Sequence, residues 1–412
     1  MKNKKIIFFT FRDFSKFGGG LIRINGVLNS VAGVAGEVIL ISNISDKEKK
    51  NLNDNIKHIH IGLKFSVIDK KLFQFLLSAL PFWMISLFFY KKISKLRFLF
   101  KEHIPEEEII FLEYVDIVIG YLLKKNNLIK NYICDVHGLV PSEFKQKNKS
   151  KTYNYIKYLS AFALDKKVFS NANGIIFASN AMRNFFYKTY PKTINKKFVL
   201  LPYFISKETC EFSINKSELS NIKNKYHLKP LDKIIFFAGG FKTLGGVTDL
   251  VKAFSIVSKK LDNTKLFLIG EGEELNNIKK IIKENKLEER VILAGVITYS
   301  ELRTYQEIAD IIVCPDRQNI YSNLILHLKY VDSLVSNKIV INGEFLAIKE
   351  VNIDEKLSIN FIPSNVNSLA NKIIYAIQHN EELAERYSNN DKYVRENLLY
   401  ENNSNILLNF VK

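Results

Sequence analysis

The sequence predicts an α/β protein with two doubly wound lobes, each a parallel sheet covered by helices on both faces. Short runs rich in Ile, Val and Phe alternate with segments of helical apolar spacing in both halves of the chain. Buried runs of this kind are typical of parallel strands. A polar stretch, residues 206–230, separates the two alternating series. We expect the domain boundary there, between two Rossmann-like lobes.

The first half alternates strands and helices in regular order. A glycine-rich turn and a helix over 18–33 follow the first strand, and another helix is expected near 151–170. The strands expected in this half are 4–11, 37–42, 58–63, 109–114, 132–138, 174–179 and 197–204.

The second half repeats the pattern. The strands expected here are 233–239, 264–272, 290–296, 310–315 and 338–342, and the helices are 247–261, 273–287, 300–309, 325–336 and 367–378. Ser300, with Glu301 in the first turn, is a typical helix start. Two lobes of this class place a ligand site in the cleft between them, outside the carboxyl ends of the strands.

Composition sets limits on partners and compartment. The chain has 412 residues, of which 47% are hydrophobic, and this length favours two domains over one. The formal charge of +18 suits anionic partners, although the joint enrichment in Lys, Asn and Ile also fits a base-composition bias. No arginine-rich tail or zinc-finger spacing indicates nucleic acid.

The cysteines and the N-terminus indicate a protein of the cytoplasm. Cys134, Cys210 and Cys314 are far apart in the sequence, so neither a zinc site nor a disulfide framework is expected. Free thiols suit a reducing cytosol. The apolar part of "MKNKKIIFFTF" is too short for a signal peptide and continues as a strand.

One segment has the composition of a membrane-contacting element. Residues 72–90 carry no charge, but Pro81 interrupts them and strands of one sheet are expected on both sides. Five basic residues follow within 91–101. The pattern predicts either peripheral docking of 72–101 on anionic lipid or a core helix with a solvated basic end.

The stretch "FFAGGFKTLGGVTDLVKAF", residues 236–254, has the form of a phosphate site. Gly239 and Gly240 end a strand and permit close approach of a ligand, and Lys242 offers a point charge. The following helix presents unpaired N–H groups and the positive end of its dipole. A tight turn without a ligand remains the alternative. The related "FGGGLIRI" (17–24) lacks the GxGxxG spacing of nicotinamide-cofactor proteins.

In their order along the chain, these motifs resemble family 4 glycosyltransferases of the GT-B fold. The resemblance covers most of the chain and rests on a set of ordered segments: "FGGGLIRINGVLNSVAGVAGEVILIS", "YICDVHGLVPSEF", "NANGIIFASNAMRNFF", "LPYF", the 236–254 stretch, "LFLIGEGEE", "RVILAGVITYSEL", "ADIIVCP" and "LKYVDSLVSNKIVI".

The resemblance implies an activity and a domain arrangement. Members transfer a sugar from a nucleotide sugar to an acceptor with retention of configuration. It implies an acceptor-side domain, residues 1–206, joined by a returning C-terminal helix at about 386–412. It places the nucleotide sugar on residues 207–385. No Asp-x-Asp occurs in the sequence, so neither a metal nor a separate cofactor is expected.

The resemblance also implies roles for particular residues. His137 would face the donor sugar as the catalytic side chain, with a structural strand-end histidine as the alternative. Glu271 would face the base or ribose, or would be an ordinary turn carboxylate. The first-lobe glycines Gly18, Gly19 and Gly20, and Gly239 and Gly240 of the second lobe, would approach the diphosphate.

The chain departs from the family at several donor contacts. Gly240 and Gly245 stand where the family usually has Arg and Lys, so Lys242 or Lys329 would supply the charge. Lys329 is otherwise a solvated helix lysine. Asp332 replaces the second of two family glutamates and would accept ribose hydroxyls. The first glutamate has no acidic counterpart at Asn319 or Leu324, which leaves Asp316, Asn319 and Asn323 as substitutes.

The predicted function is transfer of a sugar from a UDP- or GDP-linked donor to a lipid-linked or growing glycan. Such a step belongs to the synthesis of a surface polysaccharide, such as a capsule or lipopolysaccharide, at the inner face of the membrane. An inactive GT-B subunit that supports a partner enzyme is the main alternative, because of the replaced donor contacts. A sugar-nucleotide epimerase or a phosphorylase is a further one.

Overall fold

The computed structural model describes residues 5–15, 18–50, 52–61, 108–139, 141, 151–211 and 213–411. The chain divides into two compact units: Met1–Pro202 with Tyr400–Lys412, and Tyr203–Leu399. The segment 72–101, with its expected membrane contact, lies outside the described residues. None of the helices in the described ranges is long and apolar enough to cross a membrane.

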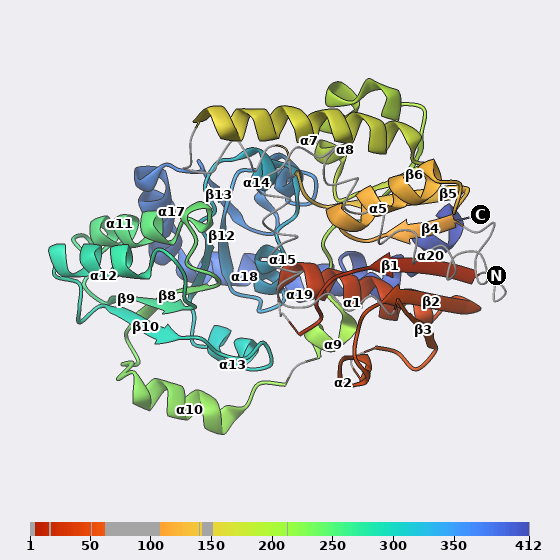
Figure 1. The fold of residues 1–412 in the computed structure, drawn as a ribbon. Helices are drawn as coiled ribbons and strands as arrows, with labels where there is room; N and C mark the ends of the chain where they lie inside the picture. Colours follow the sequence, from red (N-terminus) through yellow and green to blue (C-terminus); the bar gives the residue numbers. More distant parts are fainter. Residues whose placement is uncertain are drawn as a thin grey trace. The chain divides into compact units, whose positions relative to one another are not determined.

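Unit 1 is built on a seven-stranded sheet of order β3-β2-β1-β4-β5-β6-β7 (Figure 1). Neighbouring strands pair in parallel throughout. The strands are β1 (Lys5–Thr10), β2 (Glu37–Ser42), β3 (Ile56–His60), β4 (Glu108–Phe111), β5 (Asn131–Val136), β6 (Gly174–Phe177) and β7 (Lys197–Leu200). Five of the six residues of β1 are buried, as expected for a central strand covered on both faces.

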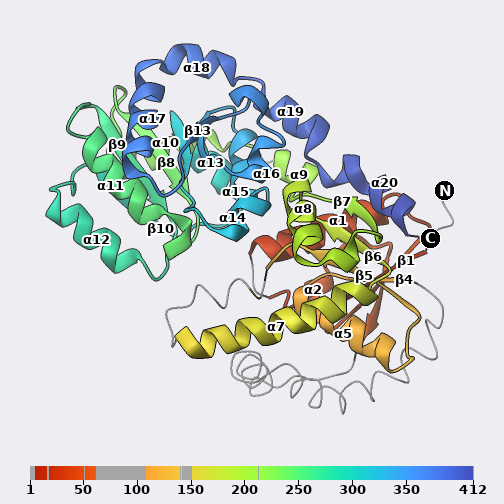
Figure 2. The same ribbon diagram turned by 90° about the horizontal axis from the view of Figure 1, so that it is seen from above.

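Helices cover both faces of this sheet (Figure 2). Those of unit 1 are α1 (Gly19–Ala32), α2 (Asp46–Lys49), α5 (Tyr114–Lys125), α7 (Lys151–Asn171), α8 (Asn180–Thr189), η1 (Pro191–Thr193) and α20 (Tyr400–Phe410). The helices α5 and α7 pack together on one side, and α1 packs against α20 on the other. A Cβ atom on Gly26 would lie 2.2 Å from the Tyr400 ring, so a glycine in α1 permits this close contact with the returning C-terminal helix.

Unit 2 contains a six-stranded sheet of order β10-β9-β8-β11-β12-β13, again with parallel pairing. Its strands are β8 (Lys233–Ala238), β9 (Thr264–Ile269), β10 (Val291–Gly295), β11 (Ile311–Cys314), β12 (Ile339–Gly343) and β13 (Ile359–Phe361).

Two apolar clusters fill the two faces of this second sheet. The larger cluster joins the sheet to α11, α12 and α17, and the smaller one joins it to α10 and α13. The helices of unit 2 are α9 (Lys207–Cys210), α10 (Lys216–Lys225), η2 (Thr243–Gly245), α11 (Val247–Val257), α12 (Leu275–Glu284), α13 (Leu302–Gln306), α14 (Ile320–Leu324), α15 (Leu328–Leu334), α16 (Leu346–Lys349), η3 (Ile353–Glu355), α17 (Val366–Gln378), α18 (Asn380–Arg386) and α19 (Asn390–Asn397).

The predicted fold class is confirmed, since both units are parallel, doubly wound α/β sheets. The predicted helix start at Ser300 is wrong. The Glu301 carboxylate accepts hydrogen bonds from the backbone N–H of Thr298 at 2.7 Å and from its hydroxyl. These bonds close a turn, and the helix begins one residue after Glu301, at Leu302.

A buried ion pair holds the centre of unit 1 together. Arg23 of α1 donates two hydrogen bonds to the Asp135 carboxylate of β5, at 2.7 and 3.1 Å, and one to the Pro202 carbonyl oxygen at 2.9 Å. Arg23 is fully buried and Asp135 is 2% exposed. Burial would raise the pKa of Asp135, but the charge of Arg23 holds it at about 2. Unpaired charges cannot be buried at this depth without a large desolvation cost.

We predict that removing either partner strongly destabilises unit 1. Arg23→Met and Asp135→Asn each leave the other partner buried and uncompensated, which costs about 3–5 kcal/mol of unfolding free energy. Urea denaturation followed by circular dichroism measures this loss. Lys280→Met, which removes the exposed Lys280–Glu284 pair of α12, is the control and should leave the transition unchanged. Equal losses of unfolding free energy in the buried-pair variants and in Lys280→Met would contradict a structural role for the Arg23–Asp135 pair.

Candidate functional site

Three neighbouring strands of unit 2 end at the edge where the predicted donor residues lie. The strands β9, β8 and β11 are adjacent and parallel, so their carboxyl ends meet at one edge. Gly239 and Gly240 follow β8, Glu271 follows β9, and Asp316 follows β11. The fold thus brings together segments that are more than thirty residues apart in the sequence.

The glycine loop after β8 is fastened to the loop after β9. The Gly239 N–H donates to the Ile269 carbonyl oxygen at 3.0 Å, and the Phe241 N–H donates to the Glu271 carbonyl oxygen at 2.8 Å. The position that requires glycine most strictly is Gly246, with a φ of +71°. A Cβ atom there would lie 1.8 Å from the Pro315 carbonyl oxygen, whereas one on Gly240 would meet only Lys242, at 3.5 Å. The roles of Gly239 and Gly240 in ligand approach therefore remain predictions.

A charged cluster lies beside these loops. The Lys329 ammonium donates to Asp316 Oδ1 at 2.8 Å and lies 5.5 Å from the centre of the Phe237 ring. His327 Nδ1 is 3.9 Å from the same carboxylate oxygen. Asp316 is 5% exposed, and its Oδ2 is buried without a hydrogen-bond partner in the described part of the chain. A buried acceptor without a partner is a place where a ligand hydroxyl would be favourable.

The ionisation states in this cluster follow from burial and charge. Burial acts to raise the pKa of Asp316, but chiefly the positive charge of Lys329 holds it below its usual value. Burial lowers the pKa of His327. The cluster therefore contains an ionised carboxylate, an ammonium group and an imidazole for which the neutral form is favoured.

Lys242 and Glu271 have exposed side chains on the two loops. Carboxylates already occupy part of the glycine loop. Glu273 accepts hydrogen bonds from the Thr243 N–H at 3.0 Å and from its hydroxyl at 2.9 Å. Glu274 accepts from the same hydroxyl at 2.7 Å. Some of the hydrogen-bond donors of this loop are thus already bonded to carboxylates of the protein.

Asp332 lies one turn after Lys329 in α15, and it is 5% exposed. Its Oδ1 accepts a hydrogen bond of 2.7 Å from the Tyr299 hydroxyl. Its carbonyl oxygen accepts one of 2.9 Å from Arg303. Burial raises the pKa of Asp332 to about 6, although Tyr299 and Arg303 act in the opposite direction. The predicted ribose contact therefore lies on a carboxylate that already has a protein partner.

The structure distinguishes the three candidate substitutes for the first family glutamate. The Asn319 side chain caps α14, accepting from the Ser322 N–H at 2.9 Å and donating to the Arg317 carbonyl oxygen. Asn323 accepts from the Leu346 N–H at 3.4 Å. Asp316 alone of the three has a buried oxygen without a described partner.

In unit 1, His137 lies two residues after Asp135, the buried partner of Arg23. Its Nδ1 lies 3.6 Å from Asp135 Oδ2, and its side chain is 14% exposed. The Asp135 carboxylate therefore lies beside the His137 ring. The sequence signal that points to this arrangement is an acidic residue inside the otherwise apolar strand "YICDV".

Arg12, a cation that the sequence analysis did not single out, lies beside the first glycine turn. Gly18 precedes α1 without a side-chain cap, and the first turn of α1, which contains Gly19 and Gly20, has no acidic residue. Arg12, after β1, pairs with Glu113. A Cβ atom on Gly20 would lie 2.6 Å from Arg12 Nη1. An uncapped helix start beside an arginine is a favourable environment for an anion.

Comparison with known proteins relates most of unit 2 to a described family. Residues 220–393 match the model described as Glycosyl transferases group 1. This part of unit 2 is therefore similar to that family, over less than half of the chain. The match covers most of unit 2, including every loop of the donor edge described above.

Individual relatives are distant. N-acetyl-alpha-D-glucosaminyl L-malate synthase of Bacillus anthracis is 30% identical over 80 residues, which are 19% of this chain and 21% of that protein. The matched segments span between 21% and 68% of the length of the curated relatives.

Solved structures share the fold over nearly the whole chain. Sucrose-phosphate synthase of Thermosynechococcus elongatus has a TM-score of 0.72 and 16% identity, over 99% of this chain and 97% of that one. Anabaena HepE in complex with UDP has a TM-score of 0.69 and 13% identity, over 98% and 99%. The predicted GT-B fold is confirmed.

We predict that Gly246→Ala destabilises unit 2 more than Gly295→Ala does. Both glycines have positive φ, +71° and +77°, so both variants incur a backbone cost of about 1–2 kcal/mol. Only the Cβ at position 246 meets another group within 4 Å, and this overlap adds about 1–3 kcal/mol. Urea denaturation measures the difference. Equal stability of the two variants would refute the close packing of the glycine loop on Pro315.

Proposed function

We propose that this protein is an active retaining glycosyltransferase. It moves a sugar from a nucleotide sugar to a lipid-linked or growing glycan acceptor in the synthesis of a surface polysaccharide. The observation that carries the proposal is the Lys329–Asp316–His327 cluster, at the strand edge where the donor loops meet. It supplies a cation for the leaving diphosphate and a carboxylate for the sugar, although the usual family residues are replaced.

The chemistry requires stabilisation of negative charge on the departing diphosphate. Electrostatic groups fixed before the reaction supply this stabilisation most effectively. Lys329 is held in place by Asp316, and Lys242 adds a second positive charge from the glycine loop. The first turn of α11, which contains Val247 and Thr248, adds the positive end of a helix dipole.

Sugar recognition would use a carboxylate of unit 2, and catalysis would use a histidine of unit 1. The unpartnered Oδ2 of Asp316 would accept a hydrogen bond from a sugar hydroxyl, which is the task of the missing family glutamate. His137 would be the catalytic side chain of unit 1, with its ring beside Asp135. Gly18, Gly19 and Gly20 would lie against the leaving phosphate beside Arg12.

A UDP-sugar is the first donor to test, and a GDP-sugar the second. HepE was solved with UDP and with UDP-glucose, and it shares the fold of this chain. Glu271 would face the base or ribose, and Asp332 would accept hydrogen bonds from the ribose hydroxyls.

An inactive GT-B subunit is the second candidate, and the glycine loop favours it. Glu273 and Glu274 already accept hydrogen bonds from Thr243, and Asp249 in the first turn of α11 pairs with Arg317 at 2.6 Å. Three carboxylates near a diphosphate site weaken anion binding. This candidate predicts binding of a partner enzyme without sugar transfer.

Calorimetric titration with UDP, GDP, ADP and CMP, and with their common sugar derivatives, tests the donor site. We predict saturable binding of one nucleotide. Lys329→Met should weaken it by about ten- to hundredfold, because hydrogen bonds to charged groups contribute about 1.5–3 kcal/mol. Asp316→Asn should weaken binding of the nucleotide sugar more than binding of the free nucleotide. Lys280→Met is the matched control on α12 and should bind normally.

Turnover then separates the two candidates. Release of the nucleoside diphosphate in the presence of membrane glycolipids supports the active enzyme. Binding without release supports the inactive subunit. Absence of binding to every nucleotide would contradict both donor-site assignments.

We further propose a cytoplasmic location with peripheral contact to the inner membrane face through residues 72–101. The support is the uncharged segment 72–90 followed by five basic residues. Co-sedimentation should occur with anionic vesicles and not with zwitterionic ones. Replacing the five basic residues with Gln should abolish it, and equal pelleting of this variant would refute the proposal.

A further inference from the structure

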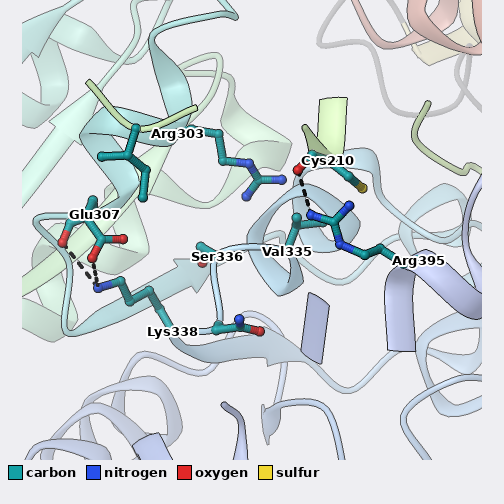
Figure 3. Close-up of a pocket in the computed structure, with 9 residues that line it drawn as sticks. Cys210, Arg303, Glu307, Val335, Ser336, Lys338 and Arg395 are labelled. Atoms are coloured by element: carbon teal, nitrogen blue, oxygen red, sulfur yellow. Dashed lines mark hydrogen bonds and ion pairs between the residues drawn. The ribbon is translucent and has the colours of Figure 1, made fainter. Parts of the chain in front are cut away.

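A polar cavity lies within unit 2, and no residue that lines it belongs to the proposed donor site. Its volume is about 440 Å³. The lining residues, shown in Figure 3, are Cys210, Ile214, Arg303, Glu307, Val335, Ser336, Asn337, Lys338 and Arg395.

This cavity lies at the opposite edge of the sheet from the donor loops. Glu307 precedes β11 and Lys338 immediately precedes β12. The donor-loop residues Gly239, Gly240, Glu271 and Asp316 instead follow the carboxyl ends of the same parallel sheet, whereas Asp332 contacts Arg303 through its carbonyl oxygen. Strands of four or five residues separate the two edges by ~13–17 Å. A ligand in the cavity would therefore not be the diphosphate of the donor.

Arg303 is the central cation of the cavity. It is only 8% exposed. Its Nη1 donates to Gln306 Oε1 at 3.0 Å and to the Asp332 carbonyl oxygen at 2.9 Å. Its Nη2 is buried and has no hydrogen-bond partner among the residues that the structure describes. A buried guanidinium N–H without an acceptor is rare, because its desolvation is not compensated.

Arg395 brings a second guanidinium into the same space (Figure 3). It donates to the Cys210 carbonyl oxygen at 2.8 Å, and its Nε is 3.5 Å from Asp391. Burial lowers the pKa of Arg303, the Asp332 carboxylate acts to raise it, and the positive charge of Arg395 makes a smaller contribution that lowers it. The two arginines are therefore close enough to repel each other.

The acidic side chain that lines the cavity, Glu307, is paired with Lys338 and not with the arginines. Glu307 accepts a hydrogen bond of 3.2 Å from Lys338, which also contacts the Glu307 carbonyl oxygen. The lining thus holds three cations and one carboxylate, and the carboxylate is engaged by the lysine. An acceptor between Arg303 and Arg395 would relieve both the missing hydrogen bond and the repulsion.

We propose that this cavity is a second anion site that binds a phosphate group, either as free phosphate or as a phosphomonoester of a small molecule. A tetrahedral phosphate presents several acceptor oxygens, and guanidinium groups bind such oxygens in pairs. The cavity exceeds the size of one phosphate ion, which leaves room for the organic part of an ester. The inference stands on these contacts and does not depend on the proposed transferase activity.

Calorimetric titration with inorganic phosphate and with glycerol 3-phosphate tests the site in the full-length chain. The Lys242→Met, Lys329→Met double variant serves as background, because it removes the cations of the donor edge that would also attract phosphate. We expect one saturable phosphate site in this background at constant ionic strength. Tighter binding of glycerol 3-phosphate than of phosphate would identify the ester as the better ligand, and the reverse order would identify the free ion.

Substitutions in the cavity should then remove this binding. In the same background, Arg303→Met should abolish it and Arg395→Gln should weaken it at least tenfold. Arg395→Gln keeps the variant set informative if Arg303→Met fails to fold. Lys280→Gln, which removes an equal charge from the exposed face of α12, should bind as the background does.

Three outcomes would overturn the site: no binding of either probe in the background, unchanged binding in Arg395→Gln, or an equal loss in Lys280→Gln.

Discussion

The buried pair of Arg23 and Asp135 is the constraint on which unit 1 depends. It joins α1 to the centre of the sheet and to the Pro202 carbonyl oxygen, 179 residues further along the chain. Both charges are almost completely excluded from water, so they must stay together. The same carboxylate lies against His137. The interaction that joins α1 to the sheet therefore also lies beside the catalytic candidate of this unit.

The charge pair of unit 2 has a different character. Lys329 is partly exposed, and its partner Asp316 keeps one buried oxygen without a described partner. A pair of this kind can exchange a protein contact for a ligand contact, because the lysine remains accessible to solvent. The pair in unit 1 cannot do so, because both of its oxygens are held by one guanidinium. This difference separates a structural ion pair from one suited to ligand binding.

Arg303 holds α15 at Asp332. Its guanidinium reaches the backbone of Asp332 in the helix that carries Lys329, while its remaining N–H points into the polar cavity. The helix is thus held from the amino edge of the sheet and bears its charged donor contact near the carboxyl edge.

The sequence by itself determined the two parallel α/β units, because runs of Ile, Val and Phe, helical spacing and glycine turns act over a few neighbouring residues. It did not predict the start of α13, where the Glu301 side chain closes a turn on Thr298. Only the tertiary structure joined Arg23 to Asp135, 112 residues apart, selected Asp316 over Asn319 and Asn323, and placed Arg303 beside Arg395. These side chains come from distant elements, and their pairing depends on burial and sheet order, which no local pattern encodes.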